Sequence, residues 1–160
     1  PVDDGCCGAG TGTVAFGFKA GIGTASRKLP ESLGGWTVGV IVQANFGGFL
    51  TVKGVAVGRQ LGGWSNEKHL SQAKPAGRAE RVIDAARHEA PYGLLEDGPT
   101  VRSDDMTPLF KAAIESTEEA ILNALFTAHD TAAYDGGRIA ALPRETVLQM
   151  LRKAGVLAER

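Results

Sequence analysis

A run of alternating glycines near the start of the chain limits what this region can fold into. Residues 8–12 read Gly-Ala-Gly-Thr-Gly, and such glycine density allows left-handed turns and close approach of other atoms. The spacing differs from the G-x-G-x-x-G of a dinucleotide loop, and strand-like residues follow where that loop needs a helix. The pattern excludes a Rossmann site and leaves two interpretations: a tight turn between strands, or a turn whose backbone shapes a pocket.

The first third of the chain has the period of two that indicates strands. Residues 14–18 and 36–43 both alternate large apolar residues with small or polar ones. Residues 49–53 and 55–57 follow a Gly-Gly pair and complete the expected antiparallel meander. Lys19 and Arg27 flank a glycine turn expected at residues 21–23, and we expect both charges to be solvated at strand ends.

Two helices are predicted in the last third of the chain. Thr107 is the expected N-cap of the first helix and Pro108 its first helical residue. Its apolar residues recur every three or four positions, which predicts one buried stripe formed by Phe110, Ala113, Ile114, Thr117, Ile121, Ala124 and Leu125. The second helix starts at Pro143 and ends at Gly155. Strands followed by helices indicate an α+β fold.

Composition and charge exclude several classes of function. The chain has 160 residues, 43% of them hydrophobic, which is enough for one domain with one core. A formal net charge of −1 argues against nucleic-acid and membrane-surface partners. The cysteines Cys6 and Cys7 are adjacent and the histidines are far apart, so no metal site is expected, and no cofactor. The small number of cysteines favours a reducing, cytoplasmic location.

The glycine run combines with two further blocks to give a recognisable pattern. Residues 18–27 read Phe-Lys-Ala-Gly-Ile-Gly-Thr-Ala-Ser-Arg, and residues 42–47 read Val-Gln-Ala-Asn-Phe-Gly. Together these blocks resemble the L-aminopeptidase/D-esterase family, also called beta-aminopeptidases. Members of this family cut themselves at a Gly-Ser bond, and the freed N-terminal serine is the nucleophile. The resemblance extends from about Gly5 to Leu61 and resumes from about Thr107 to the C-terminus.

The resemblance implies candidate site residues. By this resemblance Asn45 carries the side-chain amide that donates to the oxyanion in the family, whereas the residues alone more often indicate a turn-forming asparagine. The resemblance also implies that a glycine-rich turn shapes the pocket, and its residues are Gly8, Ala9, Gly10, Thr11 and Gly12. The nucleophile is absent, because the chain has no Gly-Ser dipeptide and the nearest counterpart, residues 97–99, reads Asp-Gly-Pro.

The resemblance also implies a fold of which this chain supplies a part. Family members form a four-layer αββα sandwich, and we interpret residues 1–160 as a single partial domain, from a fragment or an internally deleted member that begins inside the family's first subunit. Residues 1–62 form its strand-rich, glycine-rich block and residues 104–160 its C-terminal helices. Residues 63–103 form a divergent connector, in which residues 76–89 are either a replacement helix or a frame-shifted remnant, and poor order is expected there. Unpaired sheet edges favour a homo-oligomer.

Two functions of different classes follow. The resemblance implies a serine-type aminopeptidase and amidase-esterase that releases N-terminal residues from peptides, amides or esters, inactive in this form because its self-cleavage site is missing. The alternative is a non-catalytic remnant or oligomerisation module, which needs no nucleophile.

Overall fold

The computed structural model describes residues 2–62, 106–133 and 135–158. Within them the chain forms three two-stranded antiparallel sheets and a set of helices, so the α+β prediction is confirmed at this level. The predicted connector at residues 63–103, including the helix expected at residues 76–89, lies outside the described residues.

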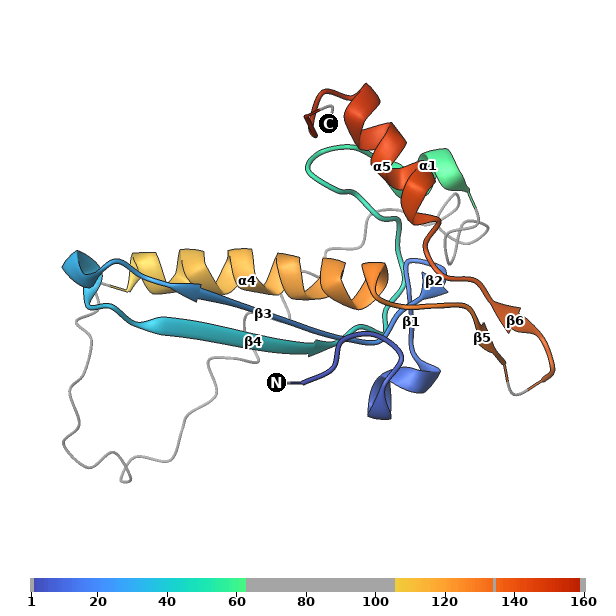
Figure 1. The fold of residues 1–160 in the computed structure, drawn as a ribbon, viewed down its shortest axis with the longest axis horizontal. Helices are drawn as coiled ribbons and strands as arrows, with labels where there is room; N and C mark the ends of the chain where they lie inside the picture. The colour runs from blue at the N-terminus through green and yellow to red at the C-terminus, as the bar shows by residue number, and fades with distance from the viewer. Residues whose placement is uncertain (1, 63–105, 134, 159–160) are drawn as a thin grey trace, which may run out of the picture.

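The largest sheet is a long hairpin of β3 (Ile22–Lys28) and β4 (Thr37–Gln43). The strands pair along their whole length, from Ile22 opposite Gln43 to Lys28 opposite Thr37. The 3-10 helix η2 (Glu31–Leu33) lies in the connection between them. The long helix α4 (Thr107–Phe126) runs along this hairpin (Figure 1). The strand predicted at residues 36–43 is therefore confirmed.

The predicted turn at residues 21–23 is wrong, since Ile22 and Gly23 begin β3. Gly5 extends the pairing at this end, because its N–H donates to Ile22 O at 2.7 Å and its carbonyl accepts from Ile22 N at 2.8 Å. Gly23 is required for packing rather than for turning. A Cβ at that position would lie 1.8 Å from Ala120 O, so only glycine lets the backbone of α4 approach β3 this closely.

Helix α4 packs largely through small residues, which corrects the first half of the predicted apolar stripe, whereas Ala124 and Leu125 are buried as predicted. Its buried positions are Ala112, Ser116, Ala120, Ala124 and Leu125. Phe110 and Ile114 were expected inside but are 60% and 69% exposed. The small side chains recur every four residues and form one face, because positions four apart lie above one another on a helix. The start of the helix also differs by one residue, with Met106 in the N-cap position rather than Thr107.

The continuous strand expected at residues 14–18 is instead a tight hairpin. Strand β1 (Val14–Ala15) pairs with β2 (Phe18–Lys19), and the loop between them consists of Phe16 and Gly17. Both loop residues have positive φ, 54° and 87°, as a two-residue type I′ connection requires. Phe16 is an unusual residue in this conformation, and its ring packs edge-on against Phe46 with 4.9 Å between centroids.

The meander predicted at residues 49–57 is also wrong. Only an isolated bridge joins Val52 and Val55, whose backbone groups hydrogen-bond in both directions at 2.9 and 3.0 Å. The chain then enters the short helix α1 (Val57–Leu61). Gly58 N donates to Leu50 O at 2.8 Å, so the start of this helix folds back onto the segment before it instead of adding a strand.

The C-terminal part adds a short hairpin and a helix. Strand β5 (Thr131–Ala132) pairs with β6 (Arg138–Ile139), and α5 (Arg144–Lys153) follows. Val147 and Leu151 are buried in α5, and Gly155 lies just after the helix with φ of 69°. These residues join one core with Leu50, Val57 and Leu125, so α1, α4 and α5 share their packing with the N-terminal segment.

Candidate functional site

The glycine run forms the 3-10 helix η1 (Gly8–Gly12) at the lower end of the hairpin in Figure 1. Backbone and side-chain hydrogen bonds hold it in place. Thr11 Oγ1 donates to Gly8 O at 2.8 Å, and Gln43 Nε2 of β4 donates to Ala9 O at 2.9 Å. Gln43 is on the face of β4 away from α4, because the partly buried Val42 precedes it. The turn is therefore fixed to the end of β4.

Asn45 lies two residues beyond β4 and contacts Val14, the second residue after this turn. Its neighbours are fixed by backbone bonds, since Ala44 N donates to Gly21 O at 3.0 Å and Phe46 N donates to Val14 O at 3.1 Å. The side-chain oxygen Oδ1 of Asn45 accepts a hydrogen bond from Val14 N at 3.4 Å. Within the described residues no acceptor contacts its Nδ2 group. The amide is exposed, so its two Nδ2 protons are available to a ligand.

The turn-forming interpretation of Asn45 predicts a different arrangement. It requires a local hydrogen bond within the loop at residues 47–48 or a left-handed backbone. Asn45 instead bonds to Val14, 31 residues earlier, and the described non-glycine residues with positive φ are Phe16 and Lys53. This bond does not fit a local turn former, and the oxyanion role of Asn45 stays a prediction.

Lys19 departs furthest from its expected role. We expected a solvated strand-end charge, but its side chain is fully buried at 0% exposure. Its Nζ donates to Gly10 O at 2.9 Å, to Thr13 O at 3.1 Å and to Ala20 O. Three carbonyls match the three protons of an ammonium group, which explains how a charge can be buried there. None of the described carboxylates forms a salt bridge with it.

Arg27 also has a structural role. Its guanidinium forms an ion pair with Glu119 of α4, and its Nε lies 3.6 Å from a carboxylate oxygen of Glu115. These groups are partly exposed, so the pairs contribute little individually. Nearby, Asn123 Nδ2 donates to Thr24 O at 2.8 Å. The three contacts fix α4 on β3, and Arg27 is not free to bind a substrate carboxylate.

The hairpin face away from α4 is open. A groove of about 450 Å³ lies along it, lined by Val2, Thr24, Ala25, Ser26, Gly39, Val40 and Ile41. Ile41 is 60% exposed there. Ser26 is exposed as well. Within the described residues its hydroxyl forms no hydrogen bond with a histidine or an acidic side chain, as a catalytic triad would require. Within the described residues this face therefore combines the apolar Val2, Val40 and Ile41 with the hydroxyls of Thr24 and Ser26, and no activated nucleophile lies on it.

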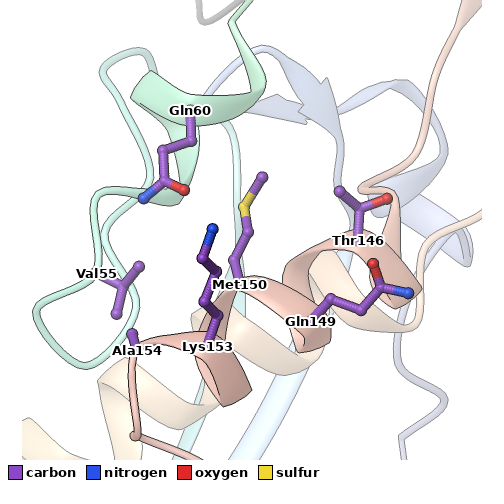
Figure 2. A pocket seen from close by; sticks show the side chains of 7 residues that line it. All are labelled: Val55, Gln60, Thr146, Gln149, Met150, Lys153 and Ala154. Carbon is purple, nitrogen blue, oxygen red and sulfur yellow. The ribbon is translucent and has the colours of Figure 1, made fainter.

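A second groove, of about 510 Å³, lies between α1 and α5. Figure 2 shows Met150 at its centre, with the amides of Gln60 and Gln149 and the ammonium of Lys153 around it. The helices α1 and α5 lie at the top of the view in Figure 1, whereas η1 lies below the hairpin. All polar side chains that line the groove are exposed. The groove therefore offers a ligand no buried polar side chain.

The described residues contain no group of three or more histidine, cysteine or acidic side chains placed to hold a metal ion. Cys6 and Cys7 are both free thiols. In the same part of the chain no helix has the length and apolarity needed to cross a membrane.

Comparison with known proteins places these features in a family. A model of peptidase family S58 matches residues 1–77 and 78–139. The chain is 29% identical over 216 residues to the beta-peptidyl aminopeptidase BapA of Sphingosinicella microcystinivorans, covering 99% of this chain and 54% of BapA. The family match continues through residues 63–103, where the sequence pattern predicted no likeness.

Solved structures agree with this result. The beta-aminopeptidase of Burkholderia sp. superposes with a TM-score of 0.73 at 30% identity, covering 99% of this chain and 56% of that one. The L-aminopeptidase D-Ala-esterase/amidase of Ochrobactrum anthropi gives 0.70 at 27% identity, covering 99% and 55%, and is described as a variant of the Ntn hydrolase fold. The chain spans about half the length of the relatives it matches. Because the family model matches most of its residues, this chain belongs to peptidase family S58.

Proposed function

We propose that this chain carries the oxyanion-binding part of an S58 aminopeptidase site and lacks the segment that supplies the nucleophile. By itself it does not release N-terminal residues from peptides, amides or esters. The observation that carries the proposal is the hydrogen bond from Val14 N to Asn45 Oδ1, which leaves the Nδ2 protons of Asn45 unpaired within the described residues, beside the turn at Gly8–Gly12.

The chemistry assigned to this arrangement is stabilisation of negative charge. Attack on an acyl carbon creates a tetrahedral oxyanion, and a fixed N–H donor aimed at that oxygen stabilises it by about 3 kcal/mol. Asn45 meets the requirement for fixation because its amide oxygen is already bound, so the amide cannot rotate freely. The proposed pocket-shaping role of Gly8, Ala9, Gly10, Thr11 and Gly12 is supported by their position, since Gln43 at the end of β4 donates to Ala9 O.

The lack of a nucleophile rests on sequence. No Gly-Ser dipeptide occurs among the 160 residues. The alignment with BapA runs over 216 residues, which is longer than this whole chain, and the family match is divided between residues 77 and 78. Both observations support an internal deletion close to residue 77. Without a covalent nucleophile, hydrolases of this kind lose about six decades of turnover.

The four-layer sandwich is proposed as the fold of the complete assembly. Helix α4 covers one face of the β3–β4 hairpin, and the other face carries the exposed Ile41 and the groove beside Thr24 and Ser26. A second sheet on this face would bury it, as sheets in sandwiches pack face to face at about 10 Å. We infer that the part of the relatives that this chain does not cover, about half of their length, supplies such a sheet.

The alternative function, a non-catalytic remnant or oligomerisation module, is favoured by a separate observation. Phe110 and Ile114 lie one turn apart on α4 and are both exposed. Exposed apolar pairs of this kind occur at protein interfaces. A homo-oligomer formed through α4 needs no active site. This alternative therefore does not depend on Asn45, whereas the oxyanion-binding function does.

Intact mass measurement tests the proposal. The purified chain is expected to remain one species of 16.7 kDa after prolonged incubation and to gain no mass from a serine-directed fluorophosphonate. Two fragments, or a fluorophosphonate adduct on either one, would mean that a nucleophile forms within this chain and that the proposal is wrong.

A further inference from the structure

The buried ammonium of Lys19 connects the two parts of the proposed site. It extends from β2 and contacts the carbonyls of Gly10, Thr13 and Ala20. Gly10 belongs to η1, and Thr13 is the residue directly after it. One side chain therefore fixes both the glycine turn and the peptide unit that follows the turn.

The peptide unit between Thr13 and Val14 extends this connection to Asn45. None of the described peptide bonds is cis, so the carbonyl of Thr13 and the N–H of Val14 point in opposite directions. The carbonyl accepts from Lys19 Nζ at 3.1 Å and also from the backbone N–H of Ala20 at 3.1 Å, and the N–H of Val14 donates to Asn45 Oδ1 at 3.4 Å. Lys19, the peptide unit and Asn45 form a continuous chain of hydrogen bonds.

We propose that Lys19 is a positioning residue that orients the Asn45 side-chain amide through the Thr13–Val14 peptide. A cation on the carbonyl polarises the peptide unit and makes its N–H a stronger donor. The stronger donor holds Asn45 Oδ1, and the Nδ2 protons then face outwards. Asn45 is exposed and its side chain forms no other hydrogen bond among the described residues, so this bond is the polar contact that orients its amide.

Lys19 is placed to act only through its neighbours. At 0% exposure it cannot reach a substrate, and all three protons are engaged by backbone carbonyls. This excludes a direct role as a base or as an amine that bonds to a carbonyl substrate. The functional meaning of the orientation rests on the proposed role of Asn45, whereas the orientation itself can be measured in the chain as it exists.

Nuclear magnetic resonance of the full chain tests the proposal. In Lys19→Met we expect amide exchange of Val14 to rise by about fivefold or more, the effect of losing one hydrogen bond. The Asn45 side-chain Nδ2 signals are expected to move to the positions of an unstructured asparagine. Gln43→Ala is the matched control, because it also releases η1 but leaves the Thr13–Val14 peptide in place, and it should leave both readouts unchanged.

A reciprocal variant keeps the proposal testable if Lys19→Met does not fold. Asn45→Ala changes an exposed side chain and removes the last bond of the chain. Coupling between two sites is reciprocal, so the Lys19 ammonium protons should exchange measurably faster in Asn45→Ala than in the unmodified chain. A folded Lys19→Met with unchanged Val14 and Asn45 signals, or unchanged Lys19 exchange in Asn45→Ala, would overturn the proposal. Neither readout depends on hydrolysis, so the proposed function can fail separately.

Discussion

At the scale of single residues, the two glycines of the β3–β4 hairpin have opposite environments. Gly23 faces α4, where an added Cβ would lie 1.8 Å from Ala120 O and 2.7 Å from Ala124 N. Both atoms belong to the backbone of a helix and cannot move aside easily. Gly39 is on the other strand, and a Cβ there meets nothing within 4 Å.

Substitution of these glycines by alanine should therefore differ sharply. Gly23→Ala is expected to destabilise the chain by about 3 kcal/mol or more, because the helix must move off the strand. Gly39→Ala should change the free energy of unfolding by less than about 1 kcal/mol. Urea denaturation of both variants measures this difference, and equal stabilities would show that α4 does not approach Gly23 as described.

Asp130 provides a pH-dependent contact at the same scale. Its carboxylate accepts a hydrogen bond from Ala141 N at 2.6 Å and forms an ion pair with Arg138. The bond from Ala141, followed by that from Arg138, lowers the pKa of Asp130 below its usual 3.8. The stabilisation is therefore complete above the unfolded value and is lost as the pH falls through the lowered folded value.

The variant Asp130→Asn should reproduce this loss at neutral pH. We expect it to unfold at a lower temperature than the unmodified chain at pH 7, and the gap between them should shrink once the pH falls below 3.8. Thermal unfolding followed by circular dichroism at several pH values measures the gap. If the difference in unfolding temperature stays constant down to acid pH, the carboxylate charge of Asp130 is not its cause.

Among secondary-structure elements, α4 has one face on the hairpin and another in solvent. Ile121 is partly buried and packs against the core, whereas Ile114, seven residues earlier, is 69% exposed. Ile121→Ala is expected to cost about 1–3 kcal/mol, since part of a buried side chain is lost. Ile114→Ala serves as the matched control and should cost less than about 0.5 kcal/mol. Equal effects on melting temperature would mean that the helix is rotated.

The sequence predicts the existence of α4 but not its buried face. Apolar periodicity identifies the helix, and the rule that large apolar residues are buried then selects Phe110 and Ile114. The structure buries Ala112 and Ser116 instead, on the same small-residue face whose backbone at Ala120 and Ala124 lies against Gly23 of β3. Which face of the helix is buried depends on the strand that packs against it, and helix periodicity alone does not predict that face.

The strand predictions succeed and fail for similar reasons. The segment at residues 36–43 is a true strand because a second strand pairs with its full length. Residues 14–18 have the same alternation, yet Phe16 and Gly17 adopt positive φ and reverse the chain. Alternation of large and small residues indicates which side chains face the same direction. A hairpin of two-residue strands shows the same alternation as one continuous strand, so the pattern does not distinguish the two.

The candidate site was predictable only in part. Asn45 follows a predicted strand and precedes a glycine pair, so its position could be inferred. Lys19 could not, because its partners are the backbone carbonyls of Gly10, Thr13 and Ala20, and a carbonyl is present at every residue. A buried charge with only backbone partners leaves no pattern of complementary side chains in the sequence.

Considered as a whole molecule, the chain has the architecture of an S58 peptidase over about half the length of its relatives. It retains Asn45 held by Val14 and the turn at Gly8–Gly12, and its 160 residues contain no Gly-Ser bond that would yield a nucleophile. We propose that the chain provides a hydrogen-bond donor for the oxyanion but lacks the nucleophile whose attack would create that oxyanion. An assembly with a chain that supplies the missing segment would then be the active form.

Turnover of amino-acid anilides by the purified chain tests this account most directly. We predict release of the aniline at the rate of the buffer blank for α- and β-amino acid anilides alike, because loss of a nucleophile removes about six decades of rate. Turnover above the blank that is abolished by a serine-directed inhibitor, and that persists after further purification, would contradict the account.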